Sequence, residues 1–227
     1  MLKLWAIINF LLKRFLIIIV LFVFQNVFCQ EYHFDRLIQY KETSIAYSGN
    51  RLVTVLFNSK NTSYYFVNRN WNNELDAYLV DNNVNVTHVY TIDDIKKSKD
   101  YEYLYSNRFN PDNCSIDCSK VKIEETKNSG QYSMIVMTEY NTKKKKKKFF
   151  EIEVISKPYD FPILKPLIKI LQHHFLFCEE IKVDESSIPT SLKLKKGSNT
   201  VLEQNLVLEK TVDVNFTVKN ENLVFRK

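Results

Sequence analysis

Hydrophobic and polar residues alternate with a period of two in the clearest segments of this chain. Between residues 149 and 155, Phe150, Ile152 and Val154 alternate with two glutamates. Residues 211–218 alternate over their whole length, with valine or phenylalanine at every second position. Because successive side chains of a β-strand point to opposite faces, these segments predict strands with one buried and one solvated face.

Further segments rich in β-branched and aromatic residues predict additional strands. They are residues 34–40, 51–57, 63–69, 83–91, 131–140, 192–195 and 223–225. The connections are short and rich in asparagine, which tolerates the left-handed backbone of tight turns. Strands joined this closely pair antiparallel, because a parallel crossover needs a dozen or more residues. We therefore expect a mainly β fold. Its sheet should be an antiparallel meander that is curved or forms a half-barrel.

Two segments depart from the alternation and predict helices. Between residues 163 and 177, leucine, isoleucine and phenylalanine recur at helical spacing, with lysine, glutamine and histidine on the opposite side. This amphipathic helix is expected to pack its apolar side on the sheet. Thr91 and Asp94 form a helix-capping pattern, which predicts a short helix over about residues 92–99.

The first 29 residues have the layout of a secretory signal peptide. Three cations and no acid precede an apolar run over residues 15–24, and Cys29 stands before the expected cleavage site at Gln30. A membrane-spanning helix needs about 20 apolar residues, more than this run supplies. An uncleaved anchor and lipidation of Cys29 are the alternatives, although Phe28 stands where a lipoprotein signal has a small residue.

Cleavage would leave residues 30–227 as a single β-rich domain, in the periplasm or outside the cell. It would remove three cations and no acid, so the net charge of +6 would fall to +3. A charge of this size argues against a dedicated nucleic-acid binder, which shows a dense basic face. We expect membrane contact only through the N-terminal segment before cleavage.

One strongly basic segment stands out against this modest charge. It is the lysine run, which consists of Lys143, Lys144, Lys145, Lys146, Lys147 and Lys148. A block of like charges predicts a solvated hairpin tip between two strands. The alternative is contact with an anionic partner such as phosphate, lipopolysaccharide or an acidic polymer.

Cys114 and Cys118 lie in a segment rich in turn-forming residues. In an oxidising compartment the expected state of this pair is a disulfide. A metal site is the alternative, but two cysteines supply half of a typical zinc ligand set and no partner pair lies nearby in sequence. We expect neither a metal nor another cofactor.

Four residues are candidate contacts for a ligand. Leu167, Leu171 and His174 share the apolar side of the predicted helix, and Trp71 lies in an asparagine-rich loop. For His174 the alternative is a histidine packed in the core. Trp71 is the best candidate for an exposed functional aromatic residue.

No segment carries a catalytic signature. The three glycines, Gly49, Gly130 and Gly197, are scattered, whereas a phosphate-binding loop needs them clustered. The chain also lacks a Gly-x-Ser-x-Gly elbow and a His-Glu-x-x-His motif. We predict no catalytic residues and do not expect an enzyme.

The signal segment, successive antiparallel strands and apolar helix together resemble the exported lipoprotein-carrier type over most of residues 34–225. In that family a curved, incompletely closed sheet holds acyl chains under covering helices. The resemblance implies a non-catalytic envelope protein that binds an apolar or amphipathic, lipid-like ligand between sheet and helix. The chain is also similar in organisation to other secreted β-rich bacterial proteins. The alternative is therefore a periplasmic or cell-surface module that binds a protein or other envelope component, with the helix simply closing its core.

Overall fold

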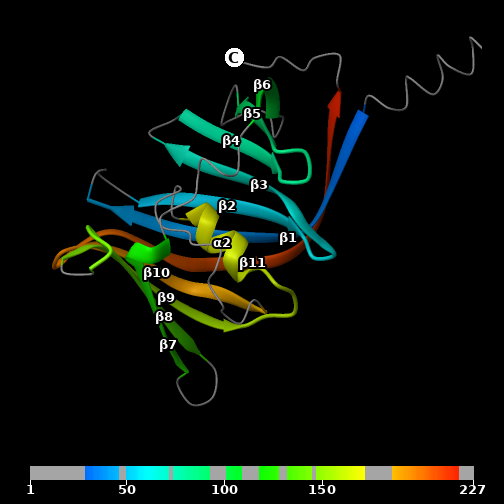
Figure 1. The fold of residues 1–227 in the computed structure, drawn as a ribbon. Coiled ribbons are helices and arrows are strands. Elements are labelled where there is room, and N and C mark those ends of the chain that lie inside the picture. Colours follow the sequence, from blue (N-terminus) through cyan, green and yellow to red (C-terminus); the bar gives the residue numbers. More distant parts are fainter. Residues whose placement is uncertain are drawn as a thin grey trace, which may run out of the picture.

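The structure is a computed structural model that describes residues 29–45, 50–71, 74–92, 101–108, 118–127, 132–144, 147–171 and 186–219. These residues form strands, one α-helix and a short 3-10 helix (Figure 1). The strands are β1 (Cys29–Ser44), β2 (Asn50–Asn58), β3 (Asn61–Trp71), β4 (Glu74–Asp81), β5 (Val86–Ile92), β6 (Tyr101–Arg108), β7 (Val121–Lys127), β8 (Ser133–Tyr140), β9 (Lys148–Pro158), β10 (Ser187–Lys196) and β11 (Asn199–Lys219). The helices are η2 (Cys118–Lys120) and α2 (Leu164–Leu171).

All the strands belong to one sheet of 11 strands, in the order β6-β5-β4-β3-β2-β1-β11-β10-β9-β8-β7. β1 to β6 pair antiparallel with their sequence neighbours, and β7 to β11 do the same. The pairing of β1 with β11 joins the two halves. β6 and β7 lie at opposite edges, so the sheet is not closed into a barrel. The predicted mainly β antiparallel meander is confirmed.

Several elements differ from the sequence-based prediction. β4, β6 and β7 were not predicted, because charged residues and tyrosines interrupt their apolar pattern. Trp71 was expected in a loop, but it ends β3 opposite Glu74. Thr91 was expected to cap a helix, but it belongs to β5. At these positions, pairing with neighbouring strands outweighed the local sequence preference for a loop or a helix.

Other predicted elements are confirmed in the part that the structure describes. The longer helix is present as α2, and residues 172–177 of its predicted span lie outside the described residues. Residues 93–99 of the predicted short helix and the predicted strand at 223–225 also lie outside them. In β9, Ile152 and Val154 are fully buried, as the alternation predicted.

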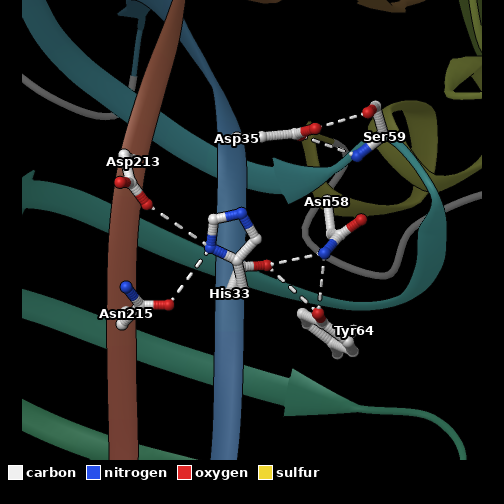
Figure 2. A network of polar contacts seen from close by, with 7 residues as sticks. All are labelled: His33, Asp35, Asn58, Ser59, Tyr64, Asp213 and Asn215. Carbon is white, nitrogen blue, oxygen red and sulfur yellow. Dashed lines mark hydrogen bonds and ion pairs between the residues drawn. The ribbon is translucent and has the colours of Figure 1, made fainter.

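The strands β1 and β11 form a long ribbon that bends between two layers. Between Phe34 and Arg36 the pairing is irregular, because two steps along β1 match three along β11. A bulge of this kind bends a strand pair and increases its twist. Figure 2 shows the ribbon crossing in front of the neighbouring strands at this bend.

The face of the sheet that carries α2 is called the inner face, and its buried cluster the inner core. β1 contributes Ile38 and Tyr40 after the bend, and β2 contributes Val53, Val55 and Phe57. α2 lies over the central strands (Figure 1). Among the residues that the structure describes, no helix is long and apolar enough to cross a bilayer.

The opposite face carries a second cluster, the outer core, beneath the bent part of the ribbon. Phe34 and Phe216 of the ribbon pack with Phe66 of β3 and Tyr90 of β5. The Phe66 and Phe216 rings stack with their centroids 4.7 Å apart. Such aromatic pairs add about 0.5–1.5 kcal/mol beyond their buried area. The sheet is therefore covered by α2 on one face and by its own longest strands on the other.

Candidate functional site

Helix α2 packs its apolar side directly against the inner face of the sheet. Leu164, Leu167, Ile168 and Leu171 are at most 1% exposed, and they share one buried cluster with residues of the surrounding strands. Burial of each such side chain contributes roughly 1.5–3 kcal/mol to stability. Leu167 and Leu171, the two predicted ligand contacts in this helix, are thus core residues. A ligand on this face would lie beside the helix.

Beside the helix, the inner face continues toward β6 as a band of apolar and aromatic side chains. The strand register aligns Val67, Tyr78, Val89 and Tyr105 across β3 to β6, and opposed residues of antiparallel strands share a face. Tyr78 and Tyr105 are half-buried, as is the neighbouring Val80. These five residues, called the apolar row, offer partly accessible apolar surface that adjoins the inner core.

Polar side chains from the sheet hold the C-terminal end of α2. Arg69 of β3 donates a hydrogen bond to the carbonyl of Ile170. The Gln204 amide of β11 donates to the carbonyl of Leu171 at 3.0 Å and to the Glu42 carboxylate at 2.6 Å. The last carbonyls of a helix have no partner inside the helix and carry partial negative charge. These contacts satisfy two of them and fix the helix on the sheet.

Glu42, Arg51, Arg69 and Gln204 are together called the helix anchor. Its charges are balanced by buried ion pairing. Glu42 is 1% exposed and lies 3.7 Å from the Arg51 guanidinium. Burial lowers the pKa of Arg69, and the nearby Glu42 carboxylate opposes that shift. A buried charge is tolerated when it is paired and hydrogen-bonded, so Glu42 is the counter-ion on which the anchor depends.

Sequence reasoning did not single out Glu42, Arg51, Arg69 or Gln204, although a signal was present. Each occupies an alternation position that its strand otherwise fills with apolar residues. Glu42 continues the series of Ile38 and Tyr40, and the other three stand in similar series. A polar or charged residue at a strand position that alternation predicts to be buried indicates a buried polar contact. Here these contacts form the helix anchor.

The outer core contains a second buried polar network, centred on His88. Its Nδ1 lies 2.7 Å from the Ser106 hydroxyl, and its Nε2 lies 3.4 Å from the Tyr32 hydroxyl. Tyr32 donates to the Asp81 carboxylate at 3.0 Å, and the Tyr103 hydroxyl lies 2.8 Å from Ser106. With the His88 proton on Nε2, every hydroxyl and ring hydrogen in this chain of contacts has an acceptor.

The network brings a serine, a histidine and a carboxylate together, which sequence reasoning did not foresee for His88. Its geometry suits packing rather than nucleophilic chemistry. Ser106 is 0% exposed and His88 1%, and Tyr32 stands between the imidazole and Asp81. Burial lowers the pKa of His88, against the opposing effect of Asp81. The neutral imidazole therefore links β5 and β6 to the ribbon.

A third network ties the bend of the ribbon to the β2–β3 turn (Figure 2). The His33 carbonyl accepts hydrogen bonds from Asn58 at 3.0 Å and Tyr64 at 3.1 Å. Asp35 accepts hydrogen bonds from the backbone amide and hydroxyl of Ser59. Although partial burial opposes ionisation, these hydrogen bonds lower the pKa of Asp35. The bend is thus held by contacts on both of its sides.

The His33 ring lies on the exposed side of this bend, toward β11. Its Nδ1 lies 3.1 Å from the Asn215 side-chain oxygen and 3.6 Å from the Asp213 carboxylate. Within the described residues, no three or more histidine, cysteine, aspartate or glutamate side chains gather as a metal site would require. The arrangement is a surface hydrogen-bond network between neighbouring strands.

The other predicted site residues are spread over the molecule. Lys143, Lys144, Lys147 and Lys148 are exposed around the connection of β8 to β9, with Lys148 in β9 itself. The remaining two lysines of the run, together with Cys114 and His174, lie outside the described residues. Trp71 and Cys118 are placed along the backbone only. The Cys114–Cys118 disulfide and the contacts of Trp71 and His174 remain predictions.

Comparison with known proteins adds little to this geometry. No protein-family model matches the chain, and no curated protein matches its sequence. A crystal structure of a LolA superfamily protein from Nitrosomonas europaea is similar to it with 10% sequence identity and a TM-score of 0.29. That alignment covers 80% of this chain and 87% of the other. It transfers no site residue to this chain.

Proposed function

We propose that this is an exported, non-catalytic envelope protein that binds an apolar or amphipathic, lipid-like ligand on the inner face, beside α2. The observation that carries the proposal is the apolar row. It extends the inner core across β3 to β6 and includes three half-buried side chains, those of Tyr78, Val80 and Tyr105. Ligand sites are commonly lined by apolar and aromatic side chains with few polar groups.

Two features of the sheet support a site at this position. The sheet is open, so its edge at β6 is not closed by β7. The helix anchor of Arg69 and Gln204 holds α2 in place, which leaves the surface toward β6 as the part available to a ligand. Export to the periplasm or the cell exterior is part of the proposal and rests on the N-terminal segment.

The test is native mass spectrometry of the protein purified from its own cell envelope. The wild type is expected to retain an apolar adduct of lipid mass. Val80→Asp, which places a charge in the apolar row, is expected to lose it. Leu52→Asp is the matched control, because Leu52 lies on the outer face of nearby β2 and is 41% exposed.

Thermal unfolding followed by circular dichroism shows whether each variant is folded. If Val80→Asp does not fold, Val80→Asn takes its place. Absence of any apolar adduct from the wild type, or equal retention by the folded Val80 and Leu52 variants, would contradict the proposal.

The alternative function, a protein-interaction module, is favoured by one observation. The side of α2 that faces the sheet is completely buried, as expected for a helix that only closes a core. In the same experiment, this alternative predicts a co-purifying protein subunit and no apolar adduct.

A further inference from the structure

We propose that one end of the sheet docks on an anionic lipid bilayer. The surface, called the basic rim, consists of two apolar residues, Ile45 and Phe149, and six lysines: Lys143, Lys144, Lys147, Lys148, Lys195 and Lys196. It goes beyond the proposed function, since it concerns a different part of the molecule and does not require a bound ligand. It also adds a membrane contact to the one expected from the N-terminal segment.

The strand topology gathers these residues at the same end. In the order β1-β11-β10-β9-β8, the connections β8–β9 and β10–β11 both lie at the end where β1 finishes (Figure 1). The register places Lys195 opposite Glu151 near the start of β9. The backbone amide of Ile45 donates to the carbonyl of Val201, near the start of β11, at 3.2 Å. The rim is therefore continuous across five strands.

The rim carries more basic than acidic residues. Lys148 pairs with Glu151 at 2.6 Å, and Lys195 pairs with Glu153. The six lysines of the rim thus exceed these two glutamates, in a chain whose net charge is +6. On the adjacent β7, Lys122 and Glu124 pair with each other. An anionic surface would therefore orient the protein by this end.

Apolar side chains are exposed among these cations. Ile45 is 73% exposed, which makes it the most exposed large apolar residue in the described part of the chain, and Phe149 is 41% exposed. The Lys196 ammonium lies 6.0 Å from the centroid of the Phe149 ring and 5.8 Å from that of Phe150. Side chains of this kind enter the boundary between head groups and acyl chains, while lysines contact the anionic head groups.

This combination favours a bilayer over a soluble polyanion. Lysines alone bind either partner through charge, whereas exposed isoleucine and phenylalanine gain free energy only where an apolar phase lies behind the charges. A solvated hairpin needs neither side chain exposed. The basic rim therefore fits an anionic lipid surface in both its charges and its apolar residues.

The test is co-sedimentation of the full chain with phosphatidylcholine vesicles, with and without phosphatidylglycerol. The N-terminal segment is common to every variant, so differences between variants report the rim. Lys143→Gln, Lys144→Gln and Lys147→Gln are combined in one variant. The control combines Lys41→Gln, Lys60→Gln and Lys210→Gln, three exposed lysines outside the rim, and so has the same net charge.

Each lysine near an anionic surface changes binding about fivefold. The rim variant should therefore bind the anionic vesicles on the order of a hundredfold more weakly than wild type, and the control close to wild type. Ile45→Ser and Phe149→Ser should each weaken binding severalfold, whereas Val84→Ser, another exposed apolar residue in the β4–β5 turn, should not. High salt should release the wild type.

Three outcomes would overturn the proposal. The first is no binding of the wild type to the anionic vesicles at physiological salt. The second is equal loss in the rim and control variants, which would report net charge alone. The third is unchanged vesicle binding by Ile45→Ser and Phe149→Ser together with full competition by a soluble polyanion, which would identify a polyanion site.

Discussion

The inner and outer cores use opposite faces of the same strands and are built differently. In β3, Tyr65 and Val67 belong to the inner core while Phe66 between them belongs to the outer core. The inner core is largely aliphatic, is covered by α2 and has its buried charges at one end of that helix. The outer core is largely aromatic, is covered by the bent ribbon and contains a buried histidine.

This difference indicates how each cover is held. The helix is held by one buried carboxylate, two guanidinium groups and one amide. The ribbon is held partly by His88, a titratable residue whose pKa is lowered by burial. We therefore expect the inner core to depend on charge pairing, and the outer core to depend on pH.

The largest effect is expected from Glu42→Gln in the helix anchor. The substitution leaves Arg51 and Arg69 without their buried counter-ion, and loss of one partner of a buried pair costs about 3–5 kcal/mol. Urea denaturation measures the change in the free energy of unfolding. Glu203→Gln is the control, because Glu203 forms an exposed pair with Lys193 of a type worth about 0.2–1 kcal/mol. Equal effects of the two substitutions would show that Glu42 does not stabilise the helix anchor.

Truncation of one leucine in each core compares the packing of the two. Leu167 and Leu79 are both 0% exposed, and a change from buried leucine to alanine costs about 2–5 kcal/mol. Leu167→Ala and Leu79→Ala should each lower stability by this amount in a single unfolding transition. Separate transitions for the two variants would show that the layers unfold independently.

The pH dependence of stability distinguishes the outer core. The folded-state pKa of His88 lies below its ordinary value of 6.5, so the unfolded chain binds the proton more readily. The stabilising contribution of neutral His88 is fully present above about pH 6.5 and declines as the pH falls below it. Unfolding free energies at several pH values should show this decline in the wild type. His88→Gln should flatten it, and an unchanged slope would exclude His88 as its source.

A smaller effect is expected from Tyr103→Phe at the end of the His88 network. It removes the Tyr103 hydroxyl that contacts Ser106 and leaves the ring in place, so the expected loss of unfolding free energy is about 0.5–1.5 kcal/mol. Tyr132→Phe is the control, because the Tyr132 side chain is 50% exposed. A loss no larger than that of the control would show that the Tyr103 hydroxyl adds nothing to the outer core.

The sequence predicted the inner core better than the outer one for a physical reason. Alternation in β9 and β10 marks a face buried against a covering element, and it correctly separated Leu192 and Leu194 from Lys193 and Lys195, which alternate with them. The alternation over residues 211–218 of β11 predicted a strand, but its apolar side chains pack in the outer core. The outer core arises because β1 and β11 bend at a bulge and return over the sheet. Local patterns carry no information about which strand a bent ribbon will cover.

The candidate site was predictable only in part. The apolar helix and its contact with the sheet followed from helical spacing, including the burial of Leu167 and Leu171. The apolar row did not, because β4 and β6 were not predicted as strands and their side chains therefore had no register. The helix anchor was missed because its polar residues lie in strands that were recognised from their apolar positions alone.

Ligand binding on the inner face is tested most directly by NMR titration of the methyl-labelled protein with a long-chain fatty acid. Val80 and Leu79 are consecutive in β4 and belong to opposite faces, the first in the apolar row and the second in the outer core. The proposed function predicts saturable shifts of the Val80 and Val89 methyl signals, with those of Leu79 and Leu56 nearly unchanged. No shift of the Val80 signal, or equal shifts of Val80 and Leu79, would contradict it.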